Sequence, residues 1–266
     1  MRRYAAAIEY DGGAYSGWQS QADAPSVQQV LQAALSQVGD EPIHCTVAGR
    51  TDAGVHAFGQ VVHFDTAARR SLRGWTLGLN SALPPDITVR WVRPVPGHFH
   101  ARYSALARTY RYLLLCRATR PAIARQYFWW LRDGLDCDAM REAAAHCLGE
   151  HDFSALRAAE CQAASPVRRV DRIAVDGRGE WVSVVVTANA FVQHMMRNLV
   201  GLLVAVGQGR ERSDCVHGLL ASRDRRLAPP TAPACGLALQ AVHYPAAFRL
   251  PEARDFRSLQ SAIMQP

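Results

Sequence analysis

The sequence contains no lysine, and all 30 of its basic residues are arginine. Schiff-base chemistry, attachment of pyridoxal phosphate and the phosphate-binding P-loop each require a lysine, so these three kinds of site are excluded. A chain whose basic residues are all arginine, with a formal net charge of +7, is suited to binding a phosphate backbone. Guanidinium groups bind phosphate through two nitrogens and stack on bases. At any single position, replacement of lysine by compositional bias is the alternative explanation.

Residues that bind metals or form disulfides are few and scattered. The seven cysteines include no C-x-x-C pair, so they indicate neither a disulfide framework nor a zinc site. His98 and His100 form one close pair of histidines, with no third ligand at a suitable spacing. We expect a protein without a bound metal.

Long apolar runs are also missing. No stretch approaches the roughly 18–20 residues that a membrane span requires. Glu9 and Asp11 interrupt the apolar character of the first residues, so a signal peptide is not indicated. We expect a soluble, cytoplasmic protein with no membrane partner.

The first hundred residues alternate between strand and helix patterns. Residues 3–11 alternate in hydrophobicity as a strand does. Ser26 is a suitable N-cap for an amphipathic helix that ends at Gly39. The remaining elements predicted in this half are strands at 43–49, 56–65 and 87–93 and a helix at 71–83. The order β-α-β-β-α-β is the split βαβ arrangement of ferredoxin-like and RRM-like domains.

The second half approximately repeats this order. The predicted strands are 108–116, 168–176, 180–188 and 236–243, and the predicted helices are 138–148, 191–206 and a shorter one after Ser213. We therefore expect an α+β protein of two similar lobes, 1–104 and 105–246, that share a central mixed sheet with a basic cleft between them. Residues 247–266 are predicted to form an irregular tail.

The motif "GRTDAG" places Arg50 and Asp52 in a turn between Gly49 and Gly54. An aspartate in such a turn commonly hydrogen-bonds the backbone, which is the structural alternative. Glycines, however, leave no Cβ to block an approaching substrate. A carboxylate at this tip can act as a nucleophile or a general base.

Two further stretches carry candidate site residues. In "RTYRYLLL", Tyr110 and Tyr112 share one face of a strand and Arg111 points to the other. The tyrosines are either core residues or an aromatic platform for an unstacked base. In "NAFVQHMMRNLVG", Arg197 lies on a helix that is apolar nearly all round, so it requires a carboxylate partner. That partner is either within the same lobe or Asp52 across the cleft.

Clusters of arginine occur at four places: 2–3, 69–73, 168–169 and 223–226. Each cluster alone is typical of a solvated face. Together with the net charge, they are consistent with a path for RNA.

Several stretches occur in the order seen in the TruA-type tRNA pseudouridine synthases, which the chain resembles from about residue 3 to 245. They are "IEYDGGAYSGWQ", "SVQQVLQAAL", "AGRTDAGVHAFGQVVHFD", "FHARYSALARTYRYLLL", "FVQHMMRNLVG" and "GLALQAV". The resemblance implies a cofactor-free homodimer that isomerises uridine to pseudouridine at positions 38, 39 and 40 of the tRNA anticodon stem-loop.

The resemblance also implies roles for individual residues. Asp52 matches the catalytic aspartate of the family, Arg197 the arginine that pairs with it, and Arg50 belongs to the same catalytic loop. Tyr110 matches the tyrosine that packs against the base and is a candidate for proton transfer. The remaining candidate substrate-binding residues are His56, Gln60 and Arg111.

Two other functions are alternatives to a pseudouridine synthase. A non-catalytic RNA-binding module would also present aromatic and arginine side chains, but a carboxylate in a basic cleft would repel phosphate. A carboxylate-dependent nucleotide hydrolase would need a second acidic cluster to hold a metal, and the sequence has none at a suitable spacing.

Overall fold

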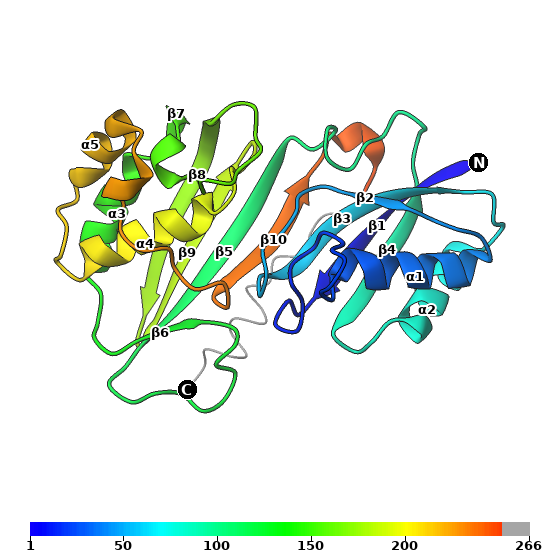
Figure 1. The fold of residues 1–266 in the computed structure, drawn as a ribbon, viewed down its shortest axis with the longest axis horizontal. Coiled ribbons are helices and arrows are strands. Elements are labelled where there is room, and N and C mark those ends of the chain that lie inside the picture. The colour runs from blue at the N-terminus through cyan, green and yellow to red at the C-terminus, as the bar shows by residue number, and fades with distance from the viewer. Residues whose placement is uncertain (252–266) are drawn as a thin grey trace. The chain divides into compact units, whose positions relative to one another are not determined.

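The computed structural model describes residues 1–251 and divides the chain into two compact units. Unit 1 holds Met1–Leu106 together with the described residues from Ala238 onward, and unit 2 holds Ala107–Leu237. Both units combine a β-sheet with α-helices (Figure 1).

The sheet of unit 1 is mixed. Its strand order is β4-β1-β3-β10, with the short β2 also paired to β3. The pairs β1–β3, β1–β4 and β2–β3 are antiparallel, whereas β10 runs parallel to β3 with Ala238 opposite His56. The bounds are β1 Arg2–Tyr10, β2 Cys45–Val47, β3 His56–Thr66, β4 Ile87–Pro94 and β10 Leu237–His243.

Two capped helices accompany this sheet: α1 (Val27–Gly39) and α2 (Leu72–Ala82). Each begins after a serine whose side chain accepts a hydrogen bond from a backbone N–H of the first turn, Ser26 from Gln29 and Ser71 from Gly74. Trp75 of α2 is fully buried, and its ring lies 5.4 Å from that of Phe64 on β3. This aromatic packing anchors the helix to the sheet.

A second core cluster in unit 1 is formed by Ala5, Ala48, Val61, Phe99 and Ala101. The segment after β10 packs against it: Tyr244 lies 5.1 Å from Phe99, ring to ring, and its hydroxyl donates to the Ala101 carbonyl. Phe248 of the 3₁₀ turn η3 (Ala246–Phe248) packs on the same cluster. These contacts tie residues 244–248 to unit 1. Positions 252–266 of the predicted tail lie outside the described residues.

The sheet of unit 2 has the antiparallel order β5-β9-β8-β7, with the short β6 parallel to β5. The helices are α3, α4 and α5, with 3₁₀ turns η1 and η2. The bounds are β5 Ala107–Cys116, β6 Trp129–Leu131, α3 Cys137–Ala145, β7 Gly149–Asp152, η1 Ser154–Leu156, β8 Val167–Arg178, β9 Trp181–Ala188, α4 Met195–Gly207, α5 Cys215–Ser222 and η2 Arg225–Leu227.

Helix α4 is the buried helix of unit 2, and Arg197 is the residue of it that is not fully buried. Gly201 lets the chain at Pro230 approach closely, because a Cβ there would lie 2.2 Å from the Pro230 carbonyl oxygen. The segment 230–236 therefore lies directly on α4.

The α+β class and the order of the predicted elements are confirmed. Three details differ from the sequence prediction. Strands β6 and β7 were not predicted, since they are only three and four residues long and do not alternate in hydrophobicity. Helix α4 begins at Met195 rather than 191, because His194 has a left-handed backbone with φ of 63°. Strand β10 was assigned to the second lobe, but its residues from Ala238 group with unit 1.

Candidate active site

The motif that contains Asp52 forms the connection between β2 and β3 in unit 1, here called the Asp52 loop (residues 49–55). The carbonyl of Asp52 accepts a hydrogen bond from the N–H of Val55, which closes a turn. Gly54 lies within this turn with φ of 75°, a conformation that favours glycine. The side chain of Asp52 is partly exposed. The turn thus presents a carboxylate that is accessible at a defined position.

Backbone hydrogen bonds to the loop between β1 and α1 hold the Asp52 loop in place. The N–H of Trp18 donates to the carbonyl of Thr51 at 3.0 Å, and the N–H of Gly54 donates to the carbonyl of Tyr15 at 3.3 Å. Gly17 has φ of 92°, and a Cβ there would lie 2.7 Å from the Thr51 carbonyl oxygen. The "YDGGAYSGWQ" motif therefore serves as the support of the Asp52 loop.

A buried hydrogen bond between two side chains, those of Tyr10 and Thr51, also supports the Asp52 loop. The Tyr10 hydroxyl on β1 lies 2.7 Å from the Thr51 Oγ1, and both residues are buried. Burial raises the pKa of Tyr10 to about 12, so its hydroxyl stays protonated at neutral pH. Because Thr51 directly precedes Asp52, this contact helps to fix the backbone position of Asp52, the candidate catalytic residue.

Gln60 and His56 on β3 also contact backbone near the loop. Gln60 is 0% exposed, and its Nε2 donates to the Gly49 carbonyl at 2.7 Å. His56 Nδ1 accepts from the Gly12 N–H at 3.1 Å and lies 3.0 Å from Asp11 Oδ1. Both side chains thus support the loop region, and the substrate contacts predicted for them from the sequence stay a prediction.

Arg50 is exposed next to Asp52. Among residues 1–251 its guanidinium makes no hydrogen bond or ion pair with another described residue. A cation at this position is available for a phosphate or for a polar group of a substrate.

Tyr110 lies on β5 of unit 2, opposite Val186 of β9. It is 8% exposed, and its ring meets that of Phe191 edge to face at 4.8 Å. Phe191 lies in the nonhelical segment before α4, which the sequence analysis had placed inside the helix. The two rings form an edge-to-face aromatic contact, and the base contact predicted for Tyr110 stays a prediction.

Arg197 lies in the first turn of α4 and is half-buried. Its Nε donates to the Ala232 carbonyl at 2.8 Å, and the Ala232 N–H donates back to the Arg197 carbonyl at 3.1 Å. Its charge also acts on Tyr112, whose hydroxyl donates to the Pro233 carbonyl. Arg197 thus lies on the face of β5 that carries the tyrosines, and segment 230–236 fixes its orientation.

The sequence-predicted residues therefore form two groups. Asp52, Arg50, His56 and Gln60 belong to unit 1, whereas Tyr110, Arg197 and Arg111 belong to unit 2. Arg111, next to Tyr110 along the strand, projects to the opposite face of β5. Pairing of Arg197 with Asp52 would join the two groups and stays a prediction.

Three residues that the structure brings to these groups were not predicted from the sequence. Tyr10 and Thr51 support the Asp52 loop, and Phe191 packs on Tyr110. Thr51 lies inside the "GRTDAG" motif itself, which could have marked it. No local pattern in the sequence signals the contacts of Tyr10 and Phe191, since their partners are distant along the chain.

Within residues 1–251, no group of three or more histidine, cysteine, aspartate or glutamate side chains is arranged to hold a metal ion. Over the same residues, no helix has the length and apolar character needed to cross a membrane.

We expect Tyr10→Phe to lower kcat about tenfold without changing KM, because Thr51 loses its partner and Asp52 is held less firmly. Steady-state kinetics with a tRNA substrate measures both constants. Tyr15→Phe is the matched control, because the Tyr15 hydroxyl donates to Asp86 rather than to the Asp52 loop. Equal losses of kcat in the two variants would contradict a positioning role for Tyr10.

We expect Tyr110→Phe to retain RNA affinity, since the ring and its contact with Phe191 remain, and to lower kcat by about 10²-fold if the hydroxyl moves a proton. Tyr110→Ala should weaken RNA binding as well, because it removes the ring. Filter binding and single-turnover kinetics separate the two effects. An unchanged kcat in Tyr110→Phe would exclude proton transfer by the Tyr110 hydroxyl and leave the ring as its only contribution.

Comparison with known proteins identifies relatives over nearly the whole chain. A family model described as tRNA pseudouridine synthase matches residues 6–104 and 143–245. The protein "tRNA pseudouridine synthase A" of Xanthomonas euvesicatoria is 53% identical over 251 residues, which are 94% of this chain and 98% of that protein. The protein of the same name from Methylococcus capsulatus is 51% identical over 253 residues, 95% of this chain and 93% of the relative.

A solved Cbf5–Nop10–Gar1 complex is similar over 76% of this chain and 45% of that chain, with 14% identity and a TM-score of 0.36, too low to support an assignment. The match to the family model and the sequence identities above 50% over nearly the full chain are sufficient to assign the family. The chain belongs to the tRNA pseudouridine synthase family.

Proposed function

We propose that this protein converts uridine to pseudouridine at positions 38, 39 and 40 of the tRNA anticodon stem-loop, with Asp52 as the catalytic carboxylate. Membership of the family establishes the coarser statement, that the chain is an isomerase that forms pseudouridine in tRNA. The observation that carries the assignment of Asp52 is the rigid, glycine-bearing turn that presents it, which is supported on three sides by Trp18, Tyr15 and Tyr10.

The reaction matches the groups available. Uridine and pseudouridine are isomers: the C1′–N1 bond breaks, a C1′–C5 bond forms, C5 loses a proton and N1 gains one. No electrons are transferred and no atoms are added, so the balance requires no cofactor. Attack of the carboxylate at C1′, attack at C6 and abstraction of a proton all use Asp52 in the same position.

The other proposed residues act on the same nucleotide. A uridine in a stem must first leave the stack, at a cost of about a few kcal/mol. Tyr110 and Phe191 offset this cost by packing against the freed base. Arg197 is proposed to pair with Asp52 and keep it ionised. Arg50, with Arg111, is proposed to bind the RNA.

Two properties of the assembly belong to the same proposal: the enzyme acts in the cytoplasm, and it works as a homodimer. Light scattering coupled to size-exclusion chromatography tests the second. A molar mass of twice the chain mass of 29.3 kDa is expected, and a concentration-independent mass equal to one chain would contradict it.

Loss of the C5 proton provides a direct assay. The protein is incubated with unmodified tRNA that carries tritium at C5 of uridine, in the presence of a chelator. Release of tritium into water is expected without added metal or nucleotide. RNA binding without release of tritium would instead favour a non-catalytic RNA-binding module.

A further inference from the structure

The charge of this chain is concentrated in one stretch. Residues 87–132 contain nine arginines and no acidic residue, whereas the rest of the chain contains 21 arginines against 23 acidic residues. The net charge of +7 therefore originates in this stretch. Its last part, residues 117–132, belongs to unit 2 and holds four arginines, at 117, 120, 125 and 132.

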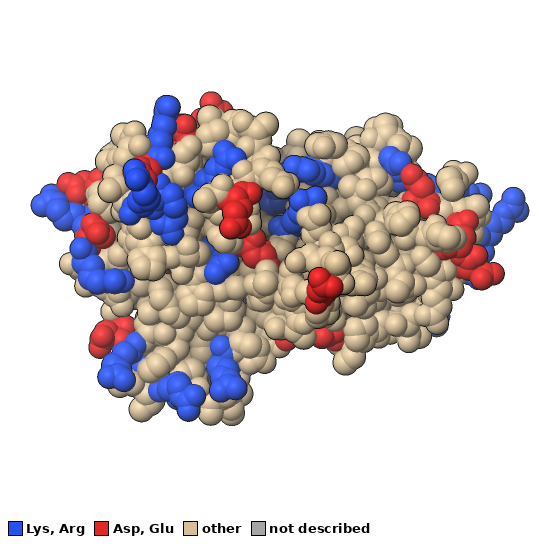
Figure 2. All heavy atoms as spheres, in the orientation of Figure 1, with Lys and Arg blue, Asp and Glu red and all other residues tan. Residues whose placement is uncertain are grey.

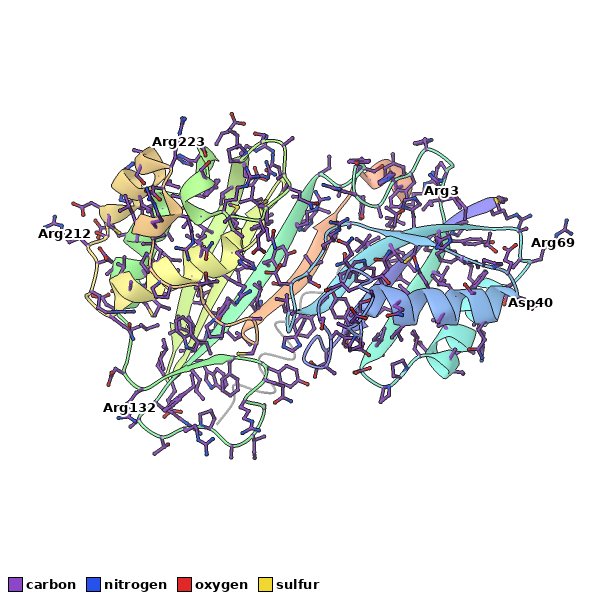
Figure 3. All side chains as sticks on the ribbon, in the orientation of Figure 1. Arg3, Asp40, Arg69, Arg132, Arg212 and Arg223 are labelled. Atoms are coloured by element: carbon purple, nitrogen blue, oxygen red, sulfur yellow. The ribbon has the colours of Figure 1, made fainter. Side chains whose placement is uncertain are left out.

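Residues 117–132 form the connection from β5 through β6 to the residues before α3, here called the arginine loop. Arg120, Arg125 and Arg132 are exposed. In Figure 2 blue side chains line the lower edge of unit 2, where Figure 1 places the loop beside β6. Figure 3 labels Arg132 at this edge.

The loop is anchored at both ends. The Arg117 N–H donates to the Leu131 carbonyl at 3.0 Å, and the Trp130 Nε1 donates to the Arg117 carbonyl at 2.8 Å. At its tip, the Tyr127 N–H donates to the Ala124 carbonyl, which closes a turn. The exposed arginines are thus carried on an anchored segment, which lowers the entropic cost of binding a ligand.

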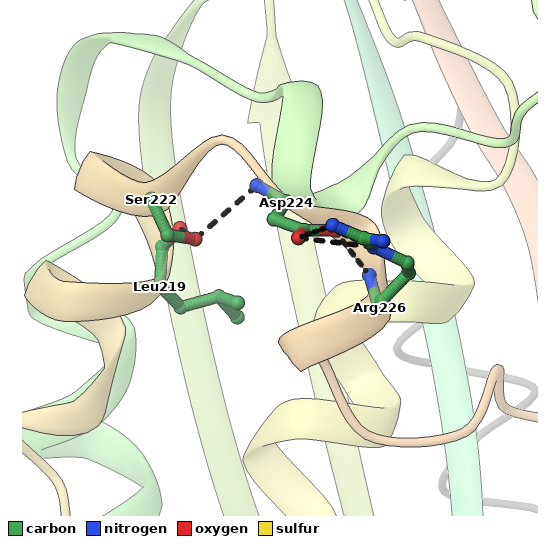
Figure 4. A network of polar contacts seen from close by, with 4 residues as sticks. All are labelled: Leu219, Ser222, Asp224 and Arg226. Carbon is green, nitrogen blue, oxygen red and sulfur yellow. Dashed lines mark hydrogen bonds and ion pairs between the residues drawn. The ribbon is translucent and has the colours of Figure 1, made fainter.

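These three arginines differ from two other exposed arginines of unit 2, Arg212 and Arg226. Arg212 lies 3.1 Å from Asp214, and Arg226 lies 2.6 Å from Asp224 (Figure 4). Arg120, Arg125 and Arg132, in contrast, make no ion pair with any residue from 1 to 251. The charges of Arg212 and Arg226 are each neutralised by a nearby aspartate. The charges of the three loop arginines are available to an anionic partner.

The position of the loop relates it to the base-binding tyrosine. Tyr110 and Cys116 are six residues apart on β5, about 20 Å at 3.3 Å per residue. An RNA whose uridine reaches Tyr110 carries a phosphate on every nucleotide along its stem. A partner that carries a regular array of phosphates suits separate, uncompensated guanidinium groups on the loop that begins where this strand ends.

We propose that the arginine loop is a second RNA-docking surface, which holds the phosphate backbone of the substrate beyond the Cys116 end of β5, away from the reacting uridine. The proposal rests on the proposed function, since it places the reacting base at Tyr110. In this arrangement the loop contributes to affinity and to the salt dependence of binding, and it contributes nothing to the chemical step.

The test is a triple variant, Arg120→Gln, Arg125→Gln and Arg132→Gln, measured with full-length unmodified tRNA across a series of salt concentrations. Each lost phosphate contact should lower the slope of log Kd against log salt by about 0.7 to 1, so the slope should fall by about 2 to 3. We expect Kd to rise at least about tenfold at physiological salt, with kcat at saturating tRNA unchanged. The matched control is Arg212→Gln, because Arg212 is exposed, is paired with Asp214 and lies outside the arginine clusters; it should change neither the slope nor kcat.

An unchanged slope in the triple variant would overturn the proposal, as would equal changes in variant and control. A loss of oligomer mass with an unchanged slope would also overturn it and would make the loop a protein interface. Activity of the unmodified protein in the same assay reports separately on the proposed function. Circular dichroism melting shows that the variants fold, which the exposed positions lead us to expect.

Discussion

Asp52→Asn is expected to abolish pseudouridine formation while the fold and the affinity for tRNA are kept. Asparagine has nearly the same shape as aspartate, so the turn closed by the Asp52 carbonyl and the Val55 N–H is retained. The carboxylate is lost, and with it the nucleophile or base. We expect a rate at least about 10⁴-fold lower, measured in single-turnover assays.

Asp23→Asn is the matched control, because Asp23 is an exposed acidic residue of the same unit outside the Asp52 loop. It should retain full activity. Substantial turnover by Asp52→Asn would remove Asp52 from the chemical step and leave the turn as a structural feature.

Arg197→Ala is expected to lower both activity and stability. The variant loses the hydrogen bond from Nε to the Ala232 carbonyl and the contact that orders segment 230–236 on α4. Loss of a half-buried charged hydrogen bond typically costs about 1 to 3 kcal/mol, which lowers Tm by about 2 to 4 °C per kcal/mol in a protein of this size. Activity should fall by at least about 10²-fold, because Asp52 loses its proposed partner.

Activity is measured well below the melting temperature, so that the folded fraction is the same in all samples. Arg197→Lys keeps the charge but not the planar guanidinium, and we expect it to recover stability more than activity. Arg210→Ala, an exposed arginine of the same unit, is the control. A variant Arg197→Ala that melts like the unmodified protein and stays active would contradict both roles of Arg197.

Elements whose signals lie in local sequence were predicted well. Ser26 and Gly39 bound helix α1 as its cap and last residue, and the alternation in 3–11 became β1. These features depend on residues a few positions apart, which the sequence displays directly.

Features that depend on distant residues were not predictable. Helix α4 begins late because His194 has a left-handed backbone, a conformation uncommon for residues other than glycine. Strand β10 pairs with β3, some 180 residues earlier, and so joins unit 1. The same limit applies to the site: Asp52 and Tyr110 could be proposed from motifs, whereas the contacts of Tyr10 with Thr51 and of Phe191 with Tyr110 arise only from folding.

We propose that this protein forms pseudouridine in the anticodon stem-loop of tRNA by means of Asp52. The most direct measurement is carbodiimide modification and primer extension on unmodified tRNA, after incubation with the unmodified protein or with Asp52→Asn. We predict stops that map pseudouridine to positions 38, 39 and 40 with the unmodified protein and none with the variant. Stops elsewhere in the tRNA, or equal stops with both proteins, would contradict the account.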